Sequence, residues 1–175
     1  AAPAPPDAAP CTPVWHQLLA NPGFDSGRVA WVELGGTPIT EAASMPIAPH
    51  AGGWAAWLAG YNGANERLVQ AVDVPADAAA LRLRGFRCYV TADTDGAGDA
   101  IEIRLLSAGG APLETLERTT NAGIGTVCSW TSFELAAAAP HAGERIQLDW
   151  SATTDGAYPT SFFVDSLALE ALACP

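Results

Sequence analysis

The sequence contains no lysine, and cationic residues are scarce throughout its 175 positions. Eight arginines stand against 19 aspartates and glutamates, which gives a formal net charge of −11 at pH 7. Nucleic acids and anionic lipid surfaces are bound through clustered cations. The charge balance therefore argues against a nucleic-acid partner and predicts an acidic exterior.

Several chemical signatures are also missing. No apolar run is long enough to span a bilayer, so we expect no membrane insertion. There is no CxxC pair, and His16, His50 and His141 have no zinc-ligand spacing to the cysteines, which argues against a zinc site. No G-x-S-x-G motif is present, and nothing in the sequence identifies a pair of carboxylates as the acid and base of a glycoside hydrolase. We predict that the chain is not an enzyme.

The four cysteines are well separated in sequence, and this spacing predicts two disulfides and an oxidising, extracellular location. Three connectivities are possible for four cysteines. We favour Cys11–Cys174, because the two ends of a domain commonly lie close together. The remaining bond, Cys88–Cys128, would then join two predicted strands.

Two regions differ in composition. Residues 1–13 are rich in alanine and proline, which predicts an extended tail or linker and excludes a helix interior or a central strand. Residues 14–175 contain many apolar residues in period-2 alternation. Their length and apolar content are sufficient for one domain with a hydrophobic core.

Short alternating segments separated by turn signals predict about ten strands and no long helix. Gly109-Gly110 is typical of a hairpin turn, and the alternation slips near Gly85, which predicts a β-bulge. Trp150 continues the inward-facing set of its strand and is predicted to be core. The expected strands are Val14–Leu19, Trp31–Leu34, Trp54–Leu58, Leu68–Val74, Leu81–Val90, Ile101–Leu105, Leu113–Glu117, Trp130–Leu135, Ile146–Trp150 and Ser161–Leu169. This pattern indicates an all-β antiparallel sandwich or barrel.

Three phrases carry a resemblance to a known group of domains. Asn21-Pro-Gly-Phe-Asp-Ser-Gly27 followed by Trp31 resembles the opening of jelly-roll carbohydrate-binding modules. Gly53-Trp-Ala-Ala-Trp-Leu-Ala-Gly60 is similar to a phrase in accessory sandwich domains of secreted bacterial peptidases. Ser161-Phe-Phe-Val-Asp165 resembles the closing strand of both groups, although Ser166 stands where a second aspartate is common. The resemblance implies a jelly-roll-like sandwich.

Calcium is the cofactor that this resemblance implies. In the resembling modules a structural calcium joins the loop after the first strand to an aspartate of the last strand. Asp25 and Asp165 match those positions, with backbone carbonyls near Asn21 as further ligands. A second calcium candidate is the Asp- and Gly-rich run that contains Asp93, Asp95 and Asp99, for which a plain turn is the alternative.

Aromatic side chains near turns are candidate platforms for sugar rings. Trp31, Tyr61 and Tyr158 are expected to be exposed, and Trp54 is a further candidate. We therefore predict a secreted, non-catalytic module that binds carbohydrate, extracellular matrix or a cell surface. The alternative is a structural subunit of an extracellular bacterial filament, sheath or surface layer, assembled with copies of itself through residues 1–13.

Overall fold

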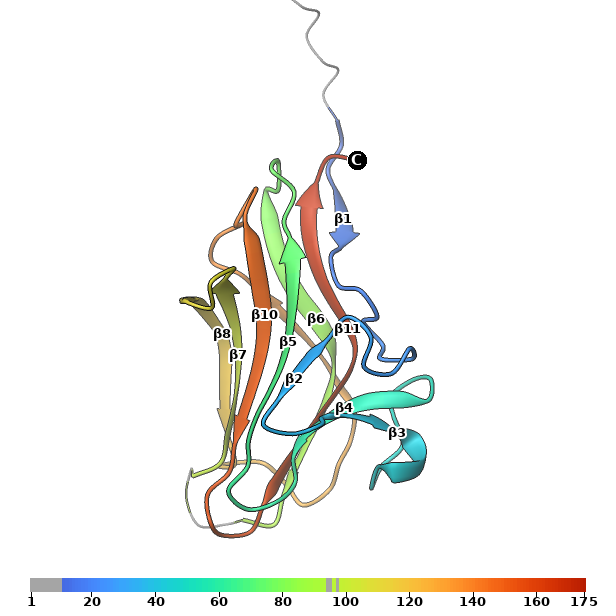
Figure 1. Cartoon of the computed structure of the whole chain (residues 1–175), viewed down its shortest axis with the longest axis vertical. Helices are drawn as coiled ribbons and strands as arrows, with labels where there is room; N and C mark the ends of the chain where they lie inside the picture. The colour runs from blue at the N-terminus through green and yellow to red at the C-terminus, as the bar shows by residue number, and fades with distance from the viewer. Residues whose placement is uncertain (1–10, 94–95, 97) are drawn as a thin grey trace, which may run out of the picture.

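Two antiparallel sheets pack face to face in the computed structural model, which describes residues 11–93, 96 and 98–175 (Figure 1). The only helical element in this part of the chain is a single 3-10 turn, η1 (Ala42–Ser44). The prediction of an all-β sandwich is confirmed, with eleven strands. Most of the predicted tail, residues 1–10, lies outside the described residues.

The first sheet is organised around the longest strand, which contacts a neighbour on each side along its length. Its order is β3-β4-β11-β6-β9, and β1 also pairs with β11. The strands are β1 (Val14–Gln17), β3 (Ile39–Glu41), β4 (Trp54–Ala59), β6 (Ala80–Thr91), β9 (Thr131–Ala136) and β11 (Thr160–Ala173).

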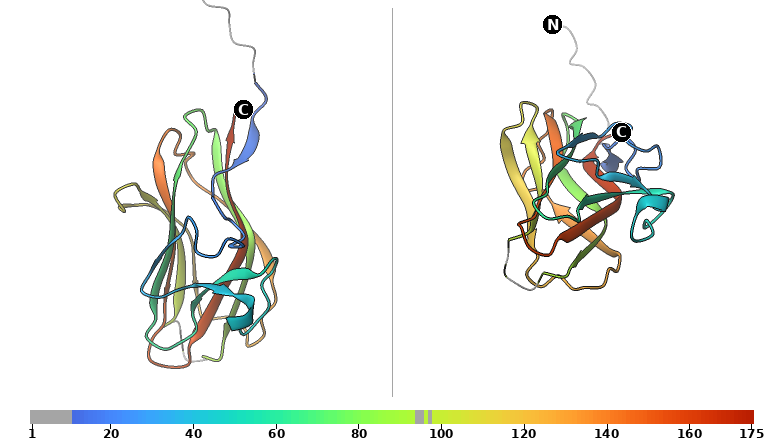
Figure 2. Two further views of the ribbon diagram at one scale, coloured as in Figure 1. Left: turned by 45° about the vertical axis from the view of Figure 1, so that its right-hand side comes forward. Right: turned by 60° about the horizontal axis from the view of Figure 1, so that its bottom comes forward.

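The second sheet has the order β2-β5-β10-β7-β8 and covers the opposite side of the core, as the two views of Figure 2 show. The predicted turn at Gly109-Gly110 joins β7 and β8, with the backbone N–H of Gly110 donating to the carbonyl of Ser107 at 2.9 Å. The strands are β2 (Val32–Leu34), β5 (Asn65–Asp73), β7 (Ala100–Ser107), β8 (Pro112–Thr120) and β10 (Arg145–Thr153).

The core lies between the sheets and follows the period-2 alternation of the strands. In β10, Ile146, Leu148 and Trp150 all point inward and are fully buried. The Trp150 ring packs edge-on against Phe133 of the other sheet, with 6.0 Å between ring centroids. The prediction that Trp150 is core is confirmed.

The bulge predicted near Gly85 exists, but it lies on the partner strand. The β11–β6 register shifts between Asp165 and Ala168, so two residues of β11 oppose Gly85. Ser166 within the bulge has a φ of 51°, in the left-handed region. A Cβ at Gly85 would come within 2.8 Å of the Leu167 side chain, so the glycine is what allows β11 to bulge across it.

Strand β3 (Ile39–Glu41) is absent from the sequence prediction, which assigned this region to a loop. The strand has three residues and follows Pro38, so it offers almost no alternation to recognise. Its pairing with β4 places Ile39 against Ala56, and Ile39 is fully buried. Tertiary packing of one side chain therefore defines this strand.

Both predicted disulfides are confirmed. Cys11–Cys174 joins the segment before β1 to the residue after β11, and Cys88–Cys128 joins β6 to the segment before β9. Within the described residues, no helix has the length and apolar character that crossing a membrane requires.

Candidate functional site

A polar pocket of about 320 Å³ opens beside Trp54, at the corner formed by β3, β4 and the loop before β2. Trp54 is half-buried, with part of its ring packed against the core. The tip of the ring lies near Gly27, where an added Cβ would be 3.9 Å from the indole. Gly27 has a φ of 63°, in the left-handed region that glycine adopts most readily. The lining residues are Arg28, Thr37, Ile39, Thr40, Glu41, Ser44 and Trp54.

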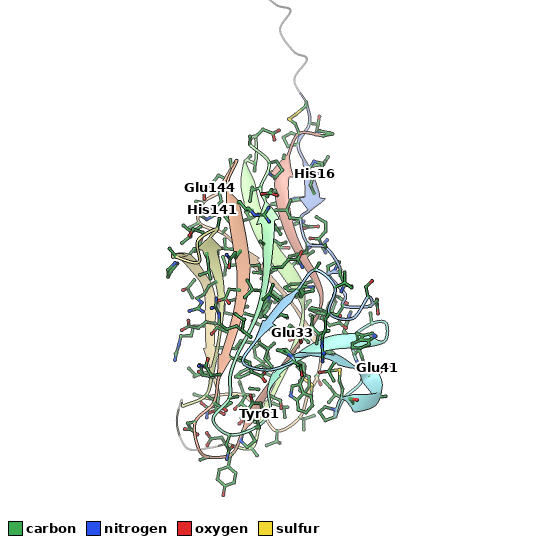
Figure 3. All side chains as sticks on the ribbon, in the orientation of Figure 1. His16, Glu33, Glu41, Tyr61, His141 and Glu144 are labelled. Carbon is green, nitrogen blue, oxygen red and sulfur yellow. A yellow bond between two sulfur atoms is a disulfide. The ribbon has the colours of Figure 1, made fainter. Side chains whose placement is uncertain are left out.

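The charges of this pocket are arranged around Arg28. Its Nε lies 3.0 Å from Oε2 of Glu33, while Oε1 of Glu33 accepts the backbone N–H of Ile39 at 2.7 Å. Glu33 therefore holds the guanidinium and ties β2 to β3 at once. Glu41 is exposed on the other side of the pocket, and Figure 3 labels both glutamates. The Arg28–Glu33 pair has no net charge, so Glu41 leaves the pocket with an excess of negative charge.

The chemistry of the pocket suits a neutral, hydroxyl-rich ligand. Thr37 and Ser44 can donate and accept hydrogen bonds. The Thr40 hydroxyl donates to the carbonyl of Pro38 at 3.0 Å and can still accept, and Glu41 adds a further acceptor. The indole of Trp54 supplies one aromatic surface. Sequence reasoning identified Trp54, but not the polar residues around it, because they come from three separate segments.

The prediction that Trp31 is an exposed platform was wrong. Only 7% of Trp31 is accessible, and its ring packs on Phe24 with 5.3 Å between centroids. Its indole N–H donates to the carbonyl of Asn21 at 3.0 Å. Trp31 therefore closes the core beneath the turn that precedes it.

Tyr61 and Tyr158 are exposed, as predicted, and lie on two loops at the same end of the sandwich; Figure 3 labels Tyr61 there. The loops are joined by hydrogen bonds from Asn62 Nδ2 to the carbonyl of Gly156 and from Thr154 Oγ1 to the carbonyl of Tyr61. The Tyr61 hydroxyl donates to Glu66 at 3.0 Å. Tyr158 projects from a loop tip with a φ of 43°.

Three carboxylates meet beside these loops: Asp93, Asp99 and Asp155 each place an oxygen within 4.8 Å of the others. Asp99 is fully buried and accepts the backbone N–H groups of Asp155 and Thr160 at 2.8 and 3.0 Å. A Cβ at position 98 would collide with the Asp155 carboxylate, so Gly98 permits this approach. Asp95, the third residue of the predicted run, lies outside the described residues.

The other predicted calcium residues lie at a different place. Asp25 Oδ1 accepts the N–H of Gly53, and Asp165 Oδ2 accepts the N–H of Ala51, each at 3.0 Å, so both carboxylates hold the same short loop. Burial raises the pKa of Asp165 despite these backbone hydrogen bonds. The side chain of Asn21 is occupied within its own turn by Gly27, Val29 and Ser26.

The structure contains a contact between a serine and a histidine, a pair of residue types that can act as nucleophile and base in enzymes. His50 Nδ1 lies 3.0 Å from Ser166 Oγ, and the His50 ring stacks on Phe86 with 3.5 Å between centroids. Neither residue lines the Trp54 pocket. The contact fixes the loop before β4 against the β11 bulge.

No protein-family model matches the sequence, and no curated protein matches it. Solved structures do match. A family 61 carbohydrate-binding module, TmCBM61, in complex with β-1,4-galactotriose is 21% identical, with a TM-score of 0.60 over 88% of this chain and 97% of that one. The K3 adhesin domain of Lys-gingipain from Porphyromonas gingivalis is 14% identical, with a TM-score of 0.59 over 90% and 99%. A non-crystalline-cellulose-specific module, CBM28, is 11% identical, with a TM-score of 0.55 over 88% and 94%.

At these identities the likeness establishes the fold. The chain has the β-sandwich architecture found in carbohydrate-binding modules and in a peptidase adhesin domain, which confirms the predicted resemblance. The matches cover nearly the full length of each of these three domains. A shared fold does not by itself assign a ligand, because the ligand depends on the residues of the binding site.

Proposed function

We propose that this protein is a non-catalytic, extracellular carbohydrate-binding module whose ligand site is the Trp54 pocket. The observation that carries the proposal is the combination of one indole surface with three hydroxyl side chains in a pocket of about 320 Å³. Sugar sites combine an aromatic surface with a few polar groups that fix the hydroxyls. Since the Arg28–Glu33 pair is neutral overall and Glu41 is acidic, an anionic ligand is disfavoured and the expected ligand is a neutral glycan.

Two further observations support the proposal. The fold is that of TmCBM61, whose structure contains β-1,4-galactotriose, and of CBM28, which is specific for non-crystalline cellulose. Two disulfides and no free cysteine among the described residues fit an oxidising compartment. The filament alternative has no observation in its favour among the described residues, and the tail on which it depends lies almost wholly outside them.

Substitution of Trp54 is expected to weaken glycan binding strongly. Trp54→Ala removes the aromatic surface, and loss of such an anchor typically costs about 2 kcal/mol or more, which is roughly 30-fold in affinity. Glu41→Ala, at an exposed position, is expected to weaken binding less. The measurement is isothermal titration with neutral oligosaccharides, beginning with β-1,4-galactotriose and followed by a glycan array.

Tyr158→Ala is the matched control, because Tyr158 is an exposed aromatic outside the pocket. If Tyr158→Ala abolished binding while Trp54→Ala did not, the site would lie at the Tyr61–Tyr158 end of the sandwich. If the wild-type protein bound no glycan on the array, the proposed function itself would be wrong. Melting temperatures of each variant separate lost binding from lost folding.

Calcium binding stays a prediction, and the carboxylate geometry favours Asp93, Asp99 and Asp155 over the pair Asp25 and Asp165. In the first group three carboxylates each place an oxygen within 4.8 Å of the others, and Asp99 also accepts two backbone N–H groups, whereas Asp25 and Asp165 hold one loop through separate backbone N–H groups. Calcium binds six to eight oxygens, so water and carbonyl groups would complete the shell.

We expect 1 mM calcium to raise the melting temperature and excess EGTA to lower it. A site filled at 100 times its dissociation constant stabilises the fold by about 2.7 kcal/mol. Asp155→Asn, at an exposed position, is expected to remove this difference, and Asp25→Asn is expected to leave it. If Asp25→Asn removed the calcium-dependent difference and Asp155→Asn left it unchanged, the ion would bind at Asp25 and Asp165. Identical melting curves with calcium and EGTA would contradict calcium binding.

A further inference from the structure

The outer face of the second sheet carries a groove that the proposed carbohydrate site does not use. It has a volume of about 340 Å³ and lies over β2, β5 and β10, with the β7–β8 turn at its rim. No aromatic residue lines it, so it lacks the stacking surface of a sugar site. The lining residues are Val32, Leu34, Arg67, Val69, Ala71, Gly110 and Gln147.

A buried carboxylate positions Arg67 at this groove. Asp149 lies on the outer face of β10 and is nevertheless fully buried, because two arginines cover it. Arg67 donates its Nε to Oδ1 of Asp149 at 2.8 Å, and Arg104 donates Nε and Nη2 to Oδ2 at 2.8 and 2.6 Å. The Nε side of the Arg67 guanidinium is thereby fixed. Its two Nη nitrogens have no hydrogen bond or ion pair with any described residue.

The local charge is opposite in sign to that of the molecule. Asp149 pairs with Arg67 and Arg104, Arg104 also contacts Glu102 at 3.4 Å, and Arg67 is the only charged side chain that lines the groove, on a protein whose net charge is −11. An arginine held on one edge presents its remaining N–H groups in a fork that matches a carboxylate. The groove therefore complements a single negative charge.

The floor of the groove defines the rest of the ligand. Val32 and Leu34 of the edge strand β2 are 54% and 44% exposed, and together with Val69 they form a branched aliphatic surface. Gln147 donates its amide nitrogen to the carbonyl of Ala108 at 2.9 Å, while its amide oxygen accepts no hydrogen bond from the described residues. The groove therefore combines the guanidinium of Arg67, an aliphatic surface and the free amide oxygen of Gln147.

We propose that this groove binds the C-terminal residue of a peptide with an aliphatic side chain. The terminal carboxylate would accept hydrogen bonds from the two Nη nitrogens of Arg67. The side chain would lie on Val32, Leu34 and Val69, and the backbone N–H of the terminal residue would donate to Gln147. Capture of a peptide carboxylate is a known recognition mode, and here it gives the module a protein partner in addition to a glycan.

The test is an NMR titration of the ¹⁵N-labelled protein with acetyl-Ala-Leu, compared with the same peptide as its C-terminal amide. Loss of a charge-assisted contact is worth about 1.5–3 kcal/mol, so the acid is expected to bind at least tenfold more tightly than the amide. Amide shifts are expected at Val32, Val69 and Gln147. Equal affinity for acid and amide, or shifts confined to other strands, would overturn the proposal.

Two variants and one competing ligand complete the test. Arg67→Gln is expected to lose at least tenfold in affinity, while Arg118→Gln, on the same sheet but outside the groove, is expected to change it little. Because Arg67 also covers Asp149, Ala71→Phe provides a second test: it fills the groove without altering that ion pair and should also block binding. Full binding by a folded Ala71→Phe variant would contradict the assignment. Tighter binding of digalacturonate than of the peptide would overturn it in favour of an acidic sugar.

Discussion

Removal of the Cys11–Cys174 disulfide is expected to lower the free energy of unfolding by about 5 kcal/mol. The bond closes a loop with a sequence separation of 163 residues, and in the chain-entropy model a loop of that length restricts the unfolded state by about that amount. Cys11 and Cys174 are both exposed, so Cys11→Ala with Cys174→Ala leaves no cavity in the core. Guanidinium unfolding of the oxidised wild type and of the double variant measures the difference.

The second disulfide provides the matched comparison. Cys88–Cys128 has a sequence separation of 40 residues, for which the same model gives about 4 kcal/mol. Cys88 is almost fully buried, so its replacement by alanine also costs packing. A loss below about 1 kcal/mol for the Cys11–Cys174 variant would mean that the reduced, unfolded chain retains structure that keeps its ends close together.

Truncation of Trp150 is expected to cost about 3–5 kcal/mol, the usual range for replacing a large buried aromatic residue with alanine. Trp150 lies in the middle of β10, is fully buried and packs edge-on against Phe133 of the opposite sheet. Trp150→Ala therefore opens a cavity between the two sheets and removes an aromatic contact across the core. Urea unfolding with a fluorescence-independent probe such as circular dichroism measures the loss.

Trp150→Phe is the informative control. The indole N–H of Trp150 has no hydrogen-bond partner among the described residues, so phenylalanine removes no stabilising bond and retains an aromatic ring. Its expected cost is about 1–2 kcal/mol, which comes from the volume lost. Equal losses for Trp150→Phe and Trp150→Ala would indicate that the indole nitrogen has a partner, such as a buried water molecule.

Much of the fold was predictable because burial on one face of a sheet imposes a two-residue period. The segment Ile146–Trp150 shows that period and became the centre of β10, and the predicted disulfides followed from the separation of the cysteines. Strand β3 was missed because three residues cannot display a period. The bulge opposite Gly85 was assigned to β6 because the phase slip of one strand does not show which partner carries the extra residue.

The candidate site was less predictable, since it depends on where separate segments meet. Position near a turn suggested exposure for Trp31 and for Tyr158, yet Trp31 closes the core and Tyr158 projects into solvent. Asp155 joins Asp93 and Asp99 only through the packing of two loops that are far apart in sequence. No local pattern in the sequence contains that information.

The position of the Cys11–Cys174 bond has a mechanical consequence. The segment that enters β1 and the C-terminus lie side by side at one end of the sandwich, as Figure 1 shows. Tension applied between the two ends of the chain would pass through the covalent bond and bypass the hydrogen bonds of both sheets. The pockets on the sandwich would then keep their shape under a load that would unzip β1 from β11 in the reduced protein.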